Sequence, residues 1–192
     1  MASPPPARSN ARAADDLPPV FTVGHSTRTI TEFVEVLRAG PVELVVDVRT
    51  IPRSRTNPQY NLDRLPEELA AYQLRHRYIA ELGGLRKKTP EVEPETNGLW
   101  RNKSFHNYAD YALTEPFRAG LDELLALAER ERCAIMCSEA VWWRCHRRII
   151  ADYLLALGRE VLHLMAPAKL VPATLTPGAV VEGGAVRYPA AA

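Results

Sequence analysis

The stretch Val42–Val48, which reads VELVVDV, constrains the fold more than any other part of the chain. Nearly continuous aliphatic side chains are expected where both faces of a strand are covered, as in a parallel sheet packed between helices. Further short apolar runs predict strands at 20–23, 76–79, 133–138 and 160–165. Helical spacing and end signals predict helices from a cap at Thr29 or Thr31 to Gly40, and at 62–74, 107–112, 115–130 and 144–157. This alternation predicts a single three-layer α/β domain with a mainly parallel central sheet.

Composition agrees with one globular domain, since 46% of the 192 residues are hydrophobic and 24% are charged. We expect a disordered leader over 1–18, an α/β catalytic-type domain over 19–166 and a Pro/Gly-rich tail over 167–192 with a weak hairpin around 180–188. No apolar run approaches the roughly 20 residues of a membrane helix, so no membrane association is expected. Three cysteines without a secretory signal favour a reducing, cytoplasmic location, and a monomer or weak dimer is expected.

Polar residues gather where the predicted strands end. They lie at 24–26, 47–49, 81–84 and 138–148. In open α/β sheets, ligands bind beyond the carboxyl ends of the strands. The sequence therefore predicts that these four segments meet at one site.

The loop 49–61 follows the strongest predicted strand and contains Arg49, Arg53 and Arg55 but no acidic residue. Arginine forks, hydroxyls and amides suit phosphate oxygens, although a solvated basic loop is the alternative. Asp47, just before this loop, is predicted to be a catalytic or substrate-orienting carboxylate. A structural pair with Arg49 is the alternative for Asp47.

The segment 137–148, CSEAVWWRCHRR, is the part of the chain richest in potentially reactive side chains. A thiol phosphatase or rhodanese-like loop needs a cysteine, five intervening residues and an arginine. Here six residues separate Cys137 from Arg144, with no glycine among them, which argues against such a loop. We predict instead that Glu139 is the working carboxylate, with a capping or arginine-pairing role as the alternative.

The cysteines and His146 do not predict a metal site. Cys133 and Cys137 would stand about 13 Å apart on a strand, too far to share a zinc ion. Cys145 and His146 are expected to diverge on a helix. No metal or other cofactor is therefore expected; His146 is a candidate acid–base group, and Cys145 is either reactive or a small buried residue.

The chain resembles the domain of unknown function 488 family over roughly 20–165. The resemblance rests on four motifs in order: TVGHS at 22–26, VDVR at 46–49 with Pro52, Ser54 and NPQY at 57–60, LGG at 82–84, and CSE at 137–139 with CHR at 145–147. It implies a compact α/β domain whose motifs are grouped at one pocket.

These features together favour a metal-independent DNA glycosylase-like hydrolase that excises a modified pyrimidine, for example 5-hydroxymethyluracil, from duplex or locally unpaired DNA. Basic sets at 49–55, 75–88 and 144–148 are expected to share one phosphate-binding rim, with loop aromatics for stacking. The alternatives are a small-molecule enzyme acting on a nucleotide or sugar phosphate and a non-catalytic nucleic-acid-binding module. The predicted catalytic residues are Asp47, Glu139 and His146, and the predicted substrate-binding residues are Gly24, His25, Ser26, Arg49, Arg53, Ser54, Arg55, Asn57, Gln59, Tyr60, Gly83, Gly84, Trp142, Arg144 and Arg147.

Overall fold

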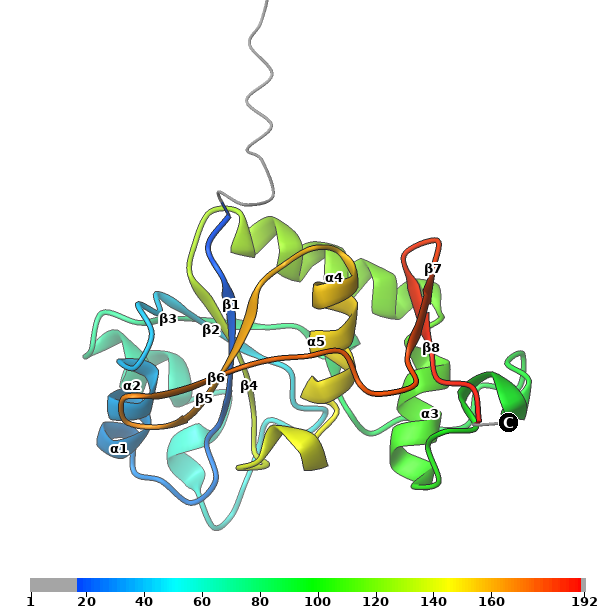
Figure 1. Cartoon of the computed structure of the whole chain (residues 1–192). Coiled ribbons are helices and arrows are strands. Elements are labelled where there is room, and N and C mark those ends of the chain that lie inside the picture. Colours follow the sequence, from blue (N-terminus) through cyan, green and yellow to red (C-terminus); the bar gives the residue numbers. More distant parts are fainter. Residues whose placement is uncertain (1–16, 191–192) are drawn as a thin grey trace, which may run out of the picture.

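The computed structural model describes residues 17–190 and has a six-stranded central sheet (Figure 1). Its strands are β1 (Val20–Gly24), β2 (Leu44–Asp47), β3 (Arg75–Tyr78), β4 (Cys133–Cys137), β5 (Val161–Ala166) and β6 (Lys169–Pro172). Their order in space is β3-β2-β4-β1-β5-β6, and only β6 pairs antiparallel with its neighbour. The predicted mainly parallel sheet is confirmed.

Helices cover both faces of the sheet. One face carries α1 (Ile30–Leu37) and α2 (Leu65–Ala70), and the other carries α3 (Lys103–Tyr111), α4 (Glu115–Ala128) and α5 (Arg147–Ala156). Strand β2 shows why its sequence is so apolar. Val45 packs toward α1 and α2, whereas Leu44 and Val46 pack toward α4 and α5. The period of two sends alternate side chains to opposite cores, so both sets must be apolar.

The helix boundaries differ from the predicted ones by up to four residues, and the difference at α5 matters most for the candidate site. A helix was predicted from residue 144, but α5 begins at Arg147. Residues Trp142–Arg144 form a 3₁₀ turn, and Cys145 is extended, with φ −130° and ψ 146°. The expectation that Cys145 and His146 diverge on a helix was therefore wrong, because both precede it.

The chain after residue 166 continues the fold. Strand β6 extends the sheet, and β7 (Val180–Glu182) pairs with β8 (Ala185–Arg187), which confirms the expected hairpin. Val186 and Tyr188 are fully buried in the core with α5, and the Tyr188 hydroxyl donates to Asp152 at 2.8 Å. Residues 1–16 of the predicted disordered leader lie outside the described residues. Within residues 17–190, every helix is too short or too polar to cross a bilayer.

Candidate functional site

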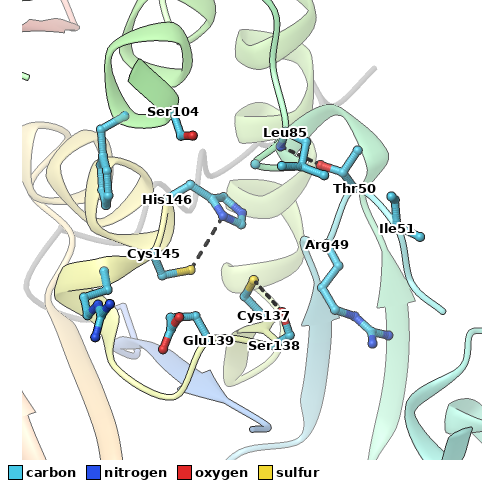
Figure 2. Close-up of a pocket in the computed structure, with 13 residues that line it drawn as sticks. Arg49, Thr50, Ile51, Leu85, Ser104, Cys137, Ser138, Glu139, Cys145 and His146 are labelled. Atoms are coloured by element: carbon cyan, nitrogen blue, oxygen red, sulfur yellow. Dashed lines mark hydrogen bonds between the residues drawn. The ribbon is translucent and has the colours of Figure 1, made fainter. Parts of the chain in front are cut away.

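Two cavities open where β2, β4 and β1 end side by side in the sheet. The first, which we call the Cys145 cavity, has a volume of about 340 Å³ (Figure 2). It is lined by residues 49–51 after β2, by 84–85, by 104–105 at the start of α3, by 137–139 after β4 and by 144–146. Segments far apart in sequence therefore meet at this edge, as the strand order predicts.

The second cavity, which we call the Arg53 cavity, measures about 400 Å³. Its lining comes from residues 25–27 after β1, from Arg49, Ile51, Arg53, Ser54 and Asn57 after β2, and from 138–140 after β4. The two cavities share Arg49, Ile51, Ser138 and Glu139. They are thus neighbouring parts of one candidate site.

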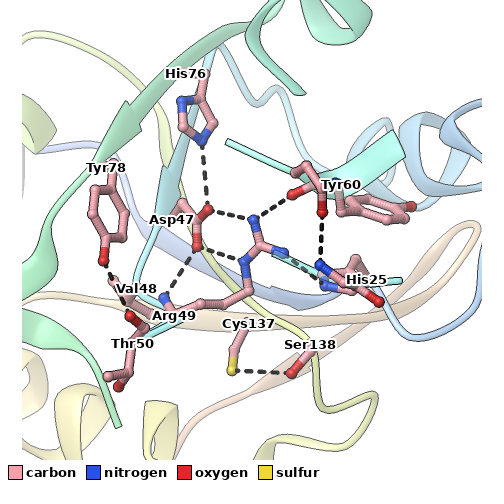
Figure 3. A network of polar contacts seen from close by, with 12 residues as sticks. His25, Asp47, Val48, Arg49, Thr50, Tyr60, His76, Tyr78, Cys137 and Ser138 are labelled. Carbon is pink, nitrogen blue, oxygen red and sulfur yellow. Dashed lines mark hydrogen bonds and ion pairs between the residues drawn. The ribbon is translucent and has the colours of Figure 1, made fainter. Parts of the chain in front are cut away.

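Asp47 lies beneath the cavities and does not line them. Its carboxylate is fully buried and accepts two hydrogen bonds from the Arg49 side chain, Nε at 2.8 Å and a terminal nitrogen at 2.6 Å (Figure 3). His76 Nε2 lies 3.7 Å away. Burial alone would raise the pKa of Asp47, but the hydrogen bonds and charge of Arg49, together with His76, hold it below its ordinary value. Asp47 is therefore ionised and holds Arg49 in place.

His25 fixes the other side of the Arg49 guanidinium. Its ring stacks on Tyr60 with centroids 3.9 Å apart, and its Nδ1 lies 2.8 Å from the Ser26 carbonyl oxygen. Burial lowers the pKa of His25 to about 4, so the ring is neutral at physiological pH. Nδ1–H therefore donates to the carbonyl, and Nε2 accepts from Arg49 at 3.3 Å. Arg49 also donates to the Tyr60 carbonyl at 2.6 Å, so four hydrogen bonds to three residues fix its orientation.

A cluster of two cysteines and one histidine lies on the face of the sheet that packs against α5, opposite the face that carries α1 and α2. Cys137 follows Ile135 on the α5 side of β4, and Cys145 Sγ lies 3.6 Å from His146 Nδ1 (Figure 2). The buried Arg147 donates from Nε to Cys145 Sγ at 3.2 Å. Burial would raise the pKa of Cys145, but a hydrogen bond with Cys137 and the neighbouring Arg147 lower it to about 6. Within residues 17–190, Cys137, Cys145 and His146 are the group whose donor atoms could hold a metal ion.

Glu139 is the one carboxylate that lines either cavity in the described part of the chain. It is exposed, and it follows β4 at the boundary between the two cavities. Its backbone carbonyl accepts a hydrogen bond from Arg147. The carbonyl also packs against Gly24 at the end of β1. Backbone contacts thus hold the residue, while its exposed side chain lines both cavities.

The structure brings ten of the predicted site residues to the cavities. These are His25, Ser26, Arg49, Arg53, Ser54, Asn57, Gly84, Glu139, Arg144 and His146. The other eight line neither cavity: Asp47, Gly24, Arg55, Gln59, Tyr60, Gly83, Trp142 and Arg147. Among these, Tyr60 and Arg147 are buried supports, and Trp142 stacks on His163 with centroids 4.3 Å apart.

Sequence reasoning missed several lining residues, mainly Thr50, Ile51, Leu85, Ser104 and Phe105. The last two reach the Cys145 cavity because α3 begins at Lys103, where the Asn102 side chain accepts hydrogen bonds from the backbone N–H groups of Ser104 and Phe105. An asparagine before a short helix is a start signal that could have revealed this.

The basic rim is smaller than predicted. Arg75 and Arg77 pair with Glu131 and Glu123, and the Arg86 guanidinium lies 3.8 Å from the Tyr111 ring centroid. The arginines that are exposed at the two cavities are Arg53 and Arg144.

Replacing Gly24 by alanine should lower the stability of the fold. An added Cβ would lie 2.0 Å from the Glu139 carbonyl oxygen and 2.8 Å from the Ala140 Cα. Both are backbone atoms, so relieving the clash requires an energetically costly shift of the main chain. Overpacking of this kind costs about 1–3 kcal/mol, which should lower the melting temperature by about 2–10 °C in a circular dichroism melt. Gly98→Ala is the control, because Gly98 has φ −61° and its nearest contact would be the Ala190 Cβ at 3.2 Å. Equal melting temperatures for the two variants would contradict the packing described here.

The fold is that of an α/β protein with a candidate ligand site at the carboxyl edge of a mainly parallel sheet. The chain belongs to the family described as "Domain of unknown function DUF488", which matches residues 29–154. The match confirms the resemblance seen in the motifs, and it includes Arg49, Glu139 and the cysteine cluster. No curated protein and no solved structure gives a significant match to this chain.

Proposed function

We propose that the protein is a hydrolase that removes a modified pyrimidine base, for example 5-hydroxymethyluracil, from DNA. One observation carries the proposal: Glu139, the one carboxylate in the described chain that lines either cavity, is shared by a mainly apolar cavity with the Phe105 ring and a more polar cavity with the exposed Arg53. This arrangement suits a ligand that has a flat base at one end and an anionic backbone at the other.

The Cys145 cavity would receive the extruded base. Its volume of about 340 Å³ is at the lower end of the range for small-ligand sites, about 300–1,000 Å³. The half-buried Phe105 ring offers a face for stacking, and Ser104 and Thr50 offer hydroxyls for the polar edge of the base. Glycosylases need such a pocket because they act on a base outside the helical stack.

The Arg53 cavity would hold the phosphates that flank the extruded nucleotide. Arg53 is exposed, and Ser54 and Asn57 add short polar groups, while the buried Arg49, paired with Asp47, supports the cavity from below. Guanidinium groups bind phosphate oxygens bidentately, which fixes the position and orientation of the DNA backbone independently of the base sequence.

Glu139 would assist the hydrolysis of the glycosidic bond. The bond between C1′ and the base nitrogen breaks, and the electron pair leaves with the base. Water adds its oxygen to C1′, Glu139 accepts a proton from that water, and the departing base gains a proton. A carboxylate beside C1′ also stabilises the oxocarbenium-like transition state.

The test is to incubate the purified protein with labelled duplexes that each carry one modified pyrimidine. Hot alkali then converts any abasic site into a strand break. A break at the position of 5-hydroxymethyluracil or a related base, absent from the unmodified duplex, is the expected result. Binding should weaken steeply with salt, since each phosphate contact contributes about 0.9 to the slope of log K against log salt.

The other outcomes would each overturn the proposal. Intact DNA across the whole panel, despite tight and salt-sensitive binding, would indicate a nucleic-acid-binding module. Intact DNA without any duplex binding would indicate a small nucleotide or sugar phosphate as the substrate.

A further inference from the structure

Three side chains that the proposed hydrolysis does not use converge at the wall of the Cys145 cavity. Cys137 ends β4, while Cys145 and His146 come from the bend before α5 (Figure 2). One ligand atom from each lies within 4.8 Å of the other two, and Cys145 Sγ is 3.6 Å from His146 Nδ1. Both cysteines are buried and are free thiols in the structure.

His146 is held in the tautomer that a metal ion requires. Its Nε2 lies 2.9 Å from the Val48 carbonyl oxygen, which can only accept, so Nε2 carries the proton. Nδ1 therefore keeps its lone pair on the side of the sulfur atoms. Metal-binding histidines commonly donate their other N–H to a backbone carbonyl in this way. Gly84 leaves room for the ring, because a Cβ there would lie 2.3 Å from Nδ1.

The distances match tetrahedral zinc. With Zn–S near 2.3 Å and Zn–N near 2.0 Å, two ligand atoms stand about 3.5 Å apart for a sulfur–nitrogen pair and about 3.8 Å for two sulfurs. The Cys145–His146 separation of 3.6 Å already fits. Since no pair exceeds 4.8 Å, the separations from the Cys137 sulfur would need to shorten by at most about 1.3 Å to complete the set.

The donor set and its surroundings also fit zinc. Two thiolates and an imidazole favour Zn²⁺ over Mg²⁺ or Ca²⁺, which prefer oxygen ligands. Binding would release the thiol protons to solvent, and the two thiolates would balance the charge of the ion. Arg147 Nε–H, 3.2 Å from Cys145 Sγ, can donate to a metal-bound thiolate as an outer-sphere partner.

We propose that Cys137, Cys145 and His146 bind one Zn²⁺ ion, whose fourth position faces the Cys145 cavity beside Glu139. All three residues line that cavity, and three protein ligands with one open position are typical of a catalytic rather than a structural zinc site. The proposal goes beyond the proposed excision of bases and does not depend on it. It differs from the expectation that no metal binds, which rested in part on placing Cys145 and His146 on a helix.

The experiment measures metal directly. The full chain is produced in zinc-supplemented medium, purified under reducing conditions without a chelating resin, and analysed by elemental mass spectrometry. We expect about one zinc per chain. Exchange for Co²⁺ should give thiolate-to-cobalt charge-transfer absorption and the intense visible bands of tetrahedral coordination. Cys137→Ser, Cys145→Ser and His146→Gln should each lower zinc affinity by at least about tenfold.

Cys133→Ser is the matched control, because Cys133 is a buried thiol on the same strand and lies outside the cluster. It should retain the zinc and the cobalt spectrum. A wild-type chain that neither contains zinc nor binds added Zn²⁺ or Co²⁺ would overturn the proposal. Zinc that persists undiminished in the Cys137→Ser/Cys145→Ser double variant would also overturn it. Neither result depends on any assay of DNA cleavage.

Discussion

Replacing Glu139 by glutamine should reduce the rate of base excision by about 10²–10⁴-fold, the range that a general base contributes. The amide keeps the shape of the side chain but can neither take the proton of the attacking water nor oppose the positive charge that develops at C1′. Because Glu139 is exposed and its backbone is held by Arg147 and Gly24, the variant should fold normally. Duplex affinity should stay within a few-fold of the wild type.

The measurement is a single-turnover time course with enzyme in excess over a duplex that contains one 5-hydroxymethyluracil, quenched into hot alkali. Single-turnover conditions separate the chemical step from product release. Glu67→Gln, a change at an exposed glutamate in α2 away from both cavities, is the matched control and should cleave at the wild-type rate. An unchanged rate in Glu139→Gln would remove this carboxylate from the chemistry.

The sheet was predictable because strands that are buried on both faces have nearly continuous apolar sequences. The apolar run of β2 and the shorter runs of β1 and β4 give the strands, and their alternation with helices gives the parallel order. From the rule that ligands bind beyond the carboxyl ends of the strands, Arg49, Glu139 and His146 were predicted to lie at one edge of the sheet, and all three line the Cys145 cavity. Which cavity each residue faces was not predictable, since it depends on the strand ends and on the loops that follow them.

The cysteine cluster could not be predicted because the start of α5 carries no capping signal. Its N-cap is His146, which makes no side-chain cap hydrogen bond, and no Ser, Thr, Asp or Asn stands there. Helical spacing of Ile149, Ile150 and Leu154 shows a helix but does not show where it begins. A shift of the start from 144 to 147 changes Cys145 from a helical residue to an extended one, and this brings its sulfur to the imidazole of His146.

The sequence predicted Asp47 to be a catalytic or substrate-orienting carboxylate, with a structural pair with Arg49 as the alternative; its burial now predicts a large effect on stability. Asp47→Asn should lower the free energy of unfolding by about 3–5 kcal/mol, because it leaves the guanidinium of Arg49 buried without its counter-charge. The aspartate is fully buried and Arg49 is 5% exposed, so water cannot replace the lost charge. The experiment is urea unfolding at neutral pH. Glu43→Gln is the control, since its pair with Arg132 is 2.7 Å long but more than 40% exposed on both sides and should contribute at most about 1 kcal/mol.

The pH dependence of the same variant gives a second, independent check on Asp47. The folded-state pKa of Asp47 lies below its ordinary value of 3.8, so the ionised pair stabilises the fold fully above about pH 4. That stabilisation is lost as the pH falls through the lowered folded-state pKa, where the carboxyl becomes protonated and resembles the amide. The difference in unfolding free energy between wild type and Asp47→Asn should therefore be constant from pH 5 to 8 and shrink below about pH 4. A difference that stays unchanged down to pH 2.5 would show that shape, and not charge, makes Asp47 necessary.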